Sequence, residues 1–418
     1  MKQIYLDNQS NTKIDEKVLK AMMPYLTENY GNPQSIYSLG SISKDALEEA
    51  RSGVAALIGA NSQEIIFTSC ATESNNLAIK GIAHAYADKG KHIIVSAIEH
   101  FSILNSVKRL EKEGFSVTYL PADAKGVVAE EELQKALRPD TILVSIQHAN
   151  PEVGTIQNIQ KLAALTKKGS EAVFHTDAVC TCGAIAVNVE DLGVDTLTLS
   201  ASVMYGPKGA AALYLKKGVK IAPQIDGGVQ ENSKRAGTEN IPAIAGFGEA
   251  CKIAKAELLA NAERMKFLRD KLIFELPKSI EHIYLNGVPQ GKNRLPGNVN
   301  FSIEFVEGEA LFLLLDAKGI MAASGSACAN KNLKISHVLS AMNVDVAVGQ
   351  GSILFTLSKY TTEQEIDYVL ETFPGIVRRL REMSPLYAHF LKTGQRMKAG
   401  PGTDYEHDHC NITEESEE

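Results

Sequence analysis

The sequence predicts an α/β protein in which a large, doubly wound, mostly parallel sheet domain precedes a smaller α+β domain. Three observations support this fold class: the length of 418 residues, a series of short apolar or β-branched runs, and the helical segments that separate these runs. A single hydrophobic core stops growing at about 250–300 residues, so a chain of this length is expected to form two domains.

The short runs have strand length and are nearly continuous in apolar or β-branched residues. They cover residues 64–67, 92–96, 117–120, 141–145, 172–175 and 196–199. Strands of this composition are buried on both faces, as in a parallel sheet covered by helices. Segments between them, such as residues 73–89 and 159–168, have helical spacing. The alternation predicts a doubly wound sheet, in which ligands bind beyond the carboxyl ends of the strands.

The second half of the chain predicts the smaller domain. Residues 241–276 contain few helix breakers and favour one long helix that leaves the large domain. Strand candidates follow at residues 282–285, 298–302 and 353–357, with helices from Glu307 and Thr362. We therefore predict an N-terminal arm packing on the small domain (1–14), a large cofactor-binding domain (15–255), a small domain (256–392) and a flexible acidic tail (393–418).

Composition narrows the range of partners. Hydrophobic residues make up 44% of the chain and charged residues 22%, as in ordinary globular proteins. The net charge of −7 and the lack of a Lys/Arg run argue against nucleic acid as a partner. The first residues contain no apolar stretch long enough for a signal or a membrane span, so we expect a cytoplasmic protein. Six cysteines then suggest thiol or metal chemistry more than a disulfide framework.

Six sequence blocks, taken together in their order and spacing, resemble the cysteine desulfurases, which belong to the class V aminotransferase group. The blocks are residues 67–77, 99–100, 175–178, 205–209, 235–240 and 324–328. The resemblance implies the fold type I architecture of pyridoxal-phosphate-dependent transferases and a homodimer whose sites draw residues from both subunits. It also implies removal of sulfur from cysteine to leave alanine, with the sulfur held as a persulfide on a loop cysteine and passed to an acceptor or scaffold protein.

The resemblance also assigns roles to individual residues. Asp177 matches the carboxylate that keeps the pyridine nitrogen protonated, as an electron-accepting ring requires. His100 matches the imidazole that stacks on the ring, and Cys328 matches the sulfur-accepting cysteine. A helix start with nearby hydroxyl groups suits the cofactor phosphate. The matching cofactor-binding positions are Ala71, Thr72, Ser200, Ser202 and, contributed across the dimer, Thr238.

The chain departs from the family at the lysine that binds the cofactor aldehyde. The family has Ser-Gly-His-Lys and one apolar residue before Tyr-Gly-Pro, whereas residues 200–204 are Ser-Ala-Ser-Val-Met. Val203 therefore replaces the lysine, and valine can neither form a Schiff base nor move the α-proton. Lys208 lies beyond a Gly-Pro turn, and we do not expect it to substitute.

Further departures fall at other site positions. Cys180 replaces a glutamine that bonds the ring hydroxyl, and Pro151 replaces an asparagine. Leu354 replaces the arginine that grips the substrate carboxylate, so a bidentate ion pair is lost. Cys70 replaces a glycine of the phosphate loop. We therefore expect ordinary desulfurase turnover to be absent or very slow.

Four functions remain open for such a chain. It could keep Cys328 as a persulfide carrier that accepts sulfur from an active homologue, or hold an assembly partner on the dimer surface. Its emptied pocket could hold a metal ion or an iron–sulfur cluster through Cys70, Cys180 and Cys328, with His100 nearby. It could bind pyridoxal phosphate without a covalent link. It could also be a regulatory or structural paralogue that pairs with an active subunit.

Overall fold

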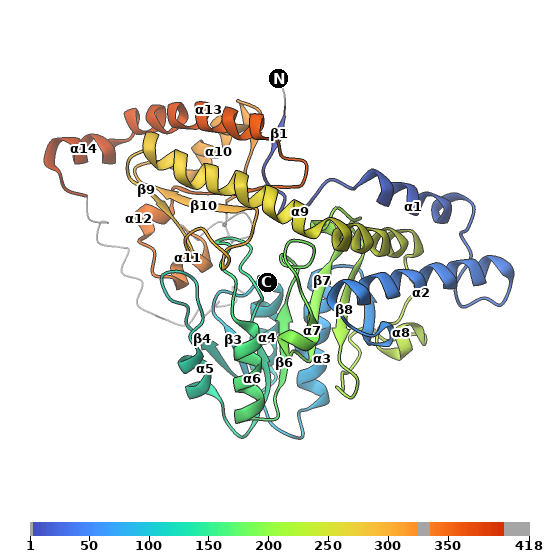
Figure 1. Cartoon of the computed structure of the whole chain (residues 1–418). Helices are drawn as coiled ribbons and strands as arrows, with labels where there is room; N and C mark the ends of the chain where they lie inside the picture. Colours follow the sequence, from blue (N-terminus) through green and yellow to red (C-terminus); the bar gives the residue numbers. More distant parts are fainter. Residues whose placement is uncertain (1–2, 325–334, 397–418) are drawn as a thin grey trace, which may run out of the picture.

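The structure of the chain is a computed structural model that describes residues 3–324 and 335–396. Figure 1 shows two α/β regions connected by the long helix α9 (Ile241–Ser279). The predicted doubly wound fold with a second α+β region is confirmed. Most of the predicted tail, beyond residue 396, lies outside the described residues.

The large sheet has seven strands in the order β2-β8-β7-β6-β5-β3-β4. Neighbouring strands are parallel except at β8, which runs antiparallel to both β2 and β7. Six of the strands were predicted, and β8 was missed because its Ala-Ala-Leu-Tyr-Leu sequence is rich in residues that favour helix. The strands are β2 (Ile65–Thr68), β3 (His92–Ser96), β4 (Ser116–Leu120), β5 (Thr141–Ser145), β6 (Val173–Asp177), β7 (Thr196–Ser200) and β8 (Ala211–Leu215).

Helices cover both faces of this sheet, which explains the continuous apolar runs. Ile94 of β3 packs in a core shared with α2 (Ser38–Ile58), α6 (Ile159–Gly169) and the first half of α9. Its neighbours Ile93 and Val95 point to the opposite face and pack with α3 (Ala71–Ala85) and α4 (Phe101–Lys112). Only the edge strand β4 is partly exposed.

The second region is built on an antiparallel sheet of order β12-β10-β9. A separate core joins this sheet to the second half of α9, from Met265 onward, and to α13 (Glu363–Glu382). Ile4 and Leu6 of the N-terminal arm enter the same core, because β1 (Ile4–Tyr5) pairs with β11 (Ile320–Met321). The strands are β9 (Ile283–Leu285), β10 (Asn298–Ile303) and β12 (Ser352–Thr356).

The remaining helices are short or peripheral. They are α1 (Glu16–Thr27), α5 (Glu130–Ala136), α7 (Val189–Leu192), α8 (Gln230–Ser233), α10 (Gly308–Asp316), α11 (His337–Ala341), α12 (Val346–Gly349) and α14 (Pro385–Thr393), with 3₁₀ turns η1 (Ser62–Glu64) and η2 (Ala201–Val203). Among the described residues, no helix is both long and apolar enough to span a bilayer.

Candidate functional site

The carboxylate of Asp177 lies at the carboxyl end of β6, where a doubly wound sheet binds its ligands. Its side chain is buried and held from two sides. Oδ1 accepts a hydrogen bond from the backbone N–H of Val179 at 3.0 Å, and Oδ2 accepts one from Nδ2 of Asn75 at 2.7 Å. These bonds fix the direction of the carboxylate without neutralising its charge.

His100 is connected to Asp177 through two intermediate side chains. His100 is the N-cap of α4, and its Nδ1 accepts from the backbone N–H of Ser102 at 3.1 Å. Nδ1 also lies 2.7 Å from the Ser102 hydroxyl, which is 2.8 Å from Asn75 Nδ2. Because the backbone N–H of Ser102 donates to Nδ1, this nitrogen carries no proton, so the Ser102 hydroxyl also donates to it and the imidazole proton is on Nε2. One polar chain thus orients both His100 and Asp177.

Asn75 and Ser102 were not assigned as site residues from the sequence. Asn75 lies within the block at residues 67–77, and Ser102 follows the block at residues 99–100. Both side chains are buried, and Asn75 Oδ1 has no hydrogen-bond partner in the described part of the chain. A buried orphan acceptor beside Asp177 is a feature that a bound polar group would satisfy.

The residues predicted to bind the cofactor phosphate, Ala71 and Thr72, lie at the start of α3. Ala71 is the first residue of the helix and Cys70 is its N-cap, with an exposed thiol that makes no capping bond. Thr72 is exposed in the first turn. Glu73 in the same turn forms an ion pair with Arg235 at 2.8 Å. This pair fastens the segment that carries the exposed Thr238 to the helix α3.

Ser200, Ser202 and Val203 lie at the carboxyl end of β7, in the turn that replaces the family's lysine segment. The hydroxyls of Ser200 and Ser202 are 3.1 Å apart. Thr12 of the N-terminal arm holds this turn, because its N–H donates to the Ser202 carbonyl at 2.8 Å and its hydroxyl accepts from the N–H of Tyr205 at 2.8 Å. Tyr205 has a positive φ of 58°. The turn is therefore well ordered although its lysine is missing.

Val203 lines a cavity of about 60 Å³ together with Cys180 and Cys182. None of the described residues that line it is a lysine. The Cys180 thiol donates to the Ala149 carbonyl at 3.0 Å. Burial, and secondly the charge of Asp177, raise the pKa of both thiols well above the usual range. Both cysteines are therefore neutral thiols at physiological pH.

Two lysines near this turn are unsuited to replace the missing amine. Lys208 is exposed beyond the Gly-Pro turn. Lys359 donates to Asp15 at 2.6 Å and to Glu257 at 3.1 Å, and its ammonium lies 4.9 Å from the Tyr205 ring centre. These partners raise the pKa of Lys359 in spite of its burial, so it stays protonated. A protonated lysine is no nucleophile toward an aldehyde.

The other two substituted positions have structural roles. The Pro151 carbonyl accepts a hydrogen bond from Asn298 Nδ2 at 3.0 Å. Leu354 is 5% exposed in β12, where its backbone pairs with Ala323 on one side and Asn300 on the other. A buried leucine offers no charge to a carboxylate substrate.

The described residues give no support of their own to the predicted metal site. No group of three or more His, Cys, Asp or Glu side chains within residues 3–324 and 335–396 is arranged to hold a metal ion. Cys70 is exposed on α3 and Cys180 is buried below the loop at Ala149. Cys328 lies outside the described residues, so its predicted roles in a metal site and as sulfur carrier remain predictions.

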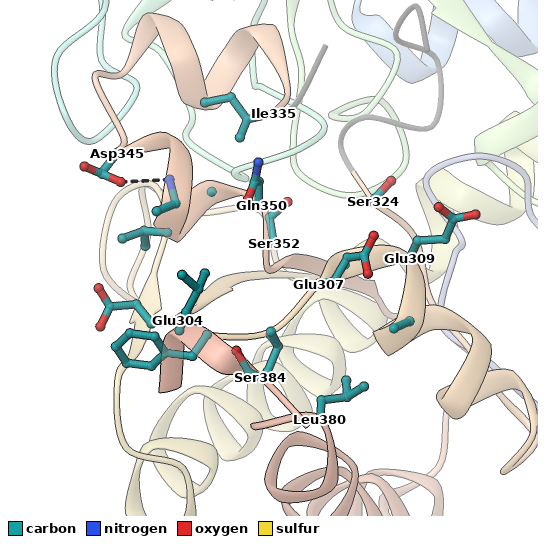
Figure 2. Close-up of a pocket in the computed structure, with 18 of the residues that line it drawn as sticks. Glu304, Glu307, Glu309, Ser324, Ile335, Asp345, Gln350, Ser352, Leu380 and Ser384 are labelled. Atoms are coloured by element: carbon teal, nitrogen blue, oxygen red, sulfur yellow. Dashed lines mark hydrogen bonds between the residues drawn. The ribbon is translucent and has the colours of Figure 1, made fainter. Parts of the chain in front are cut away.

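A second, larger cavity of about 790 Å³ lies in the C-terminal region. Ser324 and Ile335, the described residues on either side of the Cys328 segment, both line it (Figure 2). Its other lining residues include four carboxylates, Glu304, Glu307, Glu309 and Asp345, and apolar side chains of α13 and α14. The sequence did not single out this surface.

Comparisons with known proteins identify the family. A family model described as aminotransferase class-V matches residues 4–369. The chain belongs to this family. The cysteine desulfurase IscS of Dictyoglomus turgidum is 51% identical over 384 residues, which cover 92% of this chain and 97% of that protein. The cysteine desulfurase IscS 1 of Archaeoglobus fulgidus is 47% identical over 383 residues, which cover 92% of this chain and 99% of that protein.

Solved structures agree with this assignment. A NifS-like protein superposes with a TM-score of 0.85 at 39% identity and covers 90% of this chain and 100% of its own. A NifS-like protein from Rickettsia africae superposes with a TM-score of 0.80 at 33% identity, and the match covers 90% of this chain and 99% of that protein. The predicted resemblance to cysteine desulfurases and the predicted fold type I architecture are confirmed.

This aminotransferase family uses pyridoxal phosphate. The residues of the site suit the ring and the phosphate of this cofactor but not its covalent attachment. Asp177 suits the ring nitrogen, His100 suits a ring face, and the start of α3 suits the phosphate. The orphan Asn75 Oδ1 lies next to Asp177 in this arrangement. Covalent attachment does not fit the valine that stands at the position predicted for the family's lysine, Val203, because its side chain has no amine.

Proposed function

We propose that this chain is a sulfur-transfer protein of the cysteine desulfurase type in which Cys328 carries a persulfide, and that turnover of cysteine on pyridoxal phosphate is absent or very slow. The observation that carries this proposal is Val203 at the position predicted for the family's lysine. Family chemistry needs an amine that captures the aldehyde and then moves a proton. The described site retains groups that orient a ring but has no such amine.

The sulfur step that remains needs only a thiol. The thiolate of Cys328 attacks the terminal sulfur of a donor persulfide, a new S–S bond forms, and the donor thiolate leaves. An active desulfurase would supply the donor persulfide. Electrons and atoms balance without an added oxidant, because the transferred sulfur is already oxidised relative to a thiol.

Two incubations test the proposal. Purified chain mixed with pyridoxal phosphate and cysteine is expected to release no sulfide above the cofactor-only background. After incubation with an active desulfurase and cysteine, intact mass measurement is expected to show one added sulfur on the wild-type chain. The Cys328→Ser variant should lack this addition and a Cys70→Ser control should keep it. Sulfide release at ordinary enzyme rates would contradict the proposal.

We also propose that the chain forms a homodimer through the face of α1, the start of α2 and the segment before α8. Large apolar side chains are exposed there, which a second copy would cover. They include Tyr30 (73% exposed), Ile36 (102%), Tyr37 (56%) and Val229 (70%). Sedimentation should give a dimer for the wild type and a monomer for an Ile36→Asp, Val229→Asp variant.

The cavity beside the Cys328 segment is the surface that we assign to a sulfur acceptor. Glu307, Glu309 and Asp345 expose carboxylates around it, and Met383 (67% exposed) and Leu386 (45%) expose apolar groups. Such a surface suits an acceptor with basic and apolar residues. A Glu307→Lys, Glu309→Lys variant should transfer sulfur normally to a small thiol and more slowly to a protein acceptor.

Non-covalent binding of pyridoxal phosphate is a second candidate function, and the intact polar chain from His100 to Asp177 favours it. Titration with the cofactor should give saturable binding that is fully lost on dialysis. Asn75→Ala removes bonds to Asp177 and Ser102 and should weaken this binding about five- to thirtyfold, whereas Asn76→Ala, on the neighbouring surface, should not. Equal binding in both variants would exclude the site described above.

A further inference from the structure

The short helix α11 follows the Cys328 segment and belongs by sequence to the C-terminal region, but it packs on the large sheet region. Its apolar residues form a small separate core with side chains from the loops after β3, β4 and β5. This cluster contains Ile98, Ala122 and Val153 from the large region and Ile335, Val338, Leu339 and Met342 from the α11 segment.

Two polar contacts reinforce this packing at the start of α11. The hydroxyl of Ser336 donates to Glu152 Oε2 at 2.6 Å while accepting from the N–H groups of Val338 and Leu339, so it is also the N-cap. His337 Nε2 donates to the Glu99 carbonyl at 3.0 Å. Its ring centre lies 4.4 Å from that of Phe101. The start of α11 is thus fastened beside the residues that flank His100.

The other end of the Cys328 segment is attached elsewhere. Ala323 exchanges two backbone hydrogen bonds with Leu354, at 3.0 and 2.9 Å, and so belongs to the small sheet. Cys328 therefore lies in a chain segment with one end on each region. The α11 end is held by the side-chain carboxyl of Glu152.

We propose that Glu152 and Ser336 are positioning residues that hold the start of α11, which follows the Cys328 segment in the chain, on the large region beside the residues that flank His100. The inference deepens the proposed function, since it concerns how the persulfide-carrying thiol is placed. Glu152 accepts a hydrogen bond from Ser336 at the start of α11. The loop of Glu152 is held by Asn150, whose side chain accepts from the N–H of Glu152 and donates to the Ile98 carbonyl.

The chemistry of Glu152 makes this anchor sensitive to pH. The side chain is buried and Oε1 has no partner in the described part of the chain. Burial raises the pKa of Glu152 to about 7, and the Ser336 bond opposes this only in part. No charged side chain contributes to the shift. The titratable or charged groups on the elements around it are Glu99, His100, Asp123, Lys125, Arg294 and His337.

The direction of the pH effect follows from linkage. Burial raises the pKa of Glu152 from its ordinary value of 4.5 to about 7, so the protonated carboxyl favours the buried state. This stabilisation of the buried state is fully present below pH 4.5 and is lost as the pH rises to about 7. Release of α11 exposes Glu152 to water. The population of the released state should therefore rise up to roughly tenfold per pH unit between about pH 5 and about pH 7, and level off above.

Hydrogen exchange of the full-length protein tests the anchor directly. In the wild type, protection factors of the α11 amides from Val338 to Ala341, corrected for intrinsic exchange, are expected to fall by up to roughly tenfold per pH unit between about pH 5 and about pH 7. They should be nearly independent of pH in Glu152→Gln, which is neutral throughout. The matched control Glu132→Gln, a partly exposed position on α5, should retain the wild-type pH dependence.

The position of Cys328 is tested by a second measurement that does not depend on folding of Glu152→Gln. Ser336→Ala removes both the cap and the bond to Glu152, and should lower α11 protection about fivefold at every pH. It should also change the alkylation rate of Cys328 at least threefold relative to wild type, with Cys70 as internal reference. An unchanged Cys328 rate, or the same pH dependence in Glu152→Gln as in wild type, would overturn the proposal. If the hydrogen-exchange and alkylation results are as expected but Cys328 takes up no sulfur, the proposed function is wrong and the anchor formed by Glu152 and Ser336 still stands.

Discussion

Restoring the missing amine tests the reasoning about the site most directly. Val203→Lys replaces an aliphatic side chain at the edge of a cavity of about 60 Å³. The added methylene and ammonium occupy roughly the volume of one water in the liquid, about 30 Å³, so the cavity can accept them. Burial beside neutral thiols lowers the pKa of a lysine and increases its fraction of free amine. A folded protein with an aldehyde-reactive lysine is therefore expected.

The same structure predicts that the restored lysine will not restore full turnover. Leu354 leaves the substrate carboxylate without its arginine, and charged hydrogen bonds contribute about 1.5–3 kcal/mol each. A loss of about 3 kcal/mol corresponds to roughly 150-fold weaker binding of cysteine. Val203→Lys should thus bind pyridoxal phosphate covalently but release sulfide slowly. A Val203→Lys, Leu354→Arg variant should gain about 100-fold in kcat/KM over the single variant.

The assay separates attachment from turnover. Borohydride reduction in the presence of pyridoxal phosphate, followed by peptide mass analysis, should label residue 203 in Val203→Lys well above the exposed lysines, whereas no peptide of the wild type should be labelled above that surface level. Val203→Met has a similar side-chain length without an amine and serves as the matched control. Stoichiometric labelling of one wild-type lysine well above the level of the exposed lysines would contradict this expectation. So would a folded, cofactor-binding Val203→Lys that remains unlabelled.

Two further predictions concern the rest of the chain. Arg51 donates to both carboxylate oxygens of the buried Glu231 at 2.8 Å. Glu231→Gln removes the charged partner of this pair and should lower the free energy of unfolding by about 3 kcal/mol in urea titrations. The control Glu48→Gln replaces an exposed carboxylate and should change the free energy of unfolding by less than about 1 kcal/mol. Iodoacetamide at about pH 8 should modify the exposed Cys70 well before Cys180, because burial raises the pKa of the Cys180 thiol and keeps it protonated. Comparable rates at the two cysteines would show that the buried pocket opens readily.

The sequence predicted those parts of the fold that depend on local pattern. Strands such as β3 and β5 were recognisable because both faces are buried, and α9 because it contains few helix breakers over its length. The strand β8 was missed because alanine and leucine favour helix, and its strand conformation comes from pairing with β2 and β7. Pairing partners that are far apart in sequence leave no local signal.

The same limit explains which site residues were found. Val203 could be recognised because its neighbours keep the spacing of a known block. The bond between Asn75 and Asp177 joins residues 102 positions apart, and the bond between Glu152 and Ser336 joins residues 184 apart. No periodicity reports such contacts. They appear only when the tertiary structure brings the loops after β5 and β6 next to α3 and α11.

The substitutions at the site follow one physical rule. A lysine without an aldehyde, or an arginine without a carboxylate substrate, would leave a buried charge without a partner, which costs several kcal/mol. Val203 and Leu354 remove these charges, and Cys180 exchanges an amide for a thiol that needs only the Ala149 carbonyl. Asp177 retains two hydrogen-bond donors, Asn75 Nδ2 and the Val179 N–H. These substitutions suit a pocket without a covalently bound cofactor, as the proposed function requires.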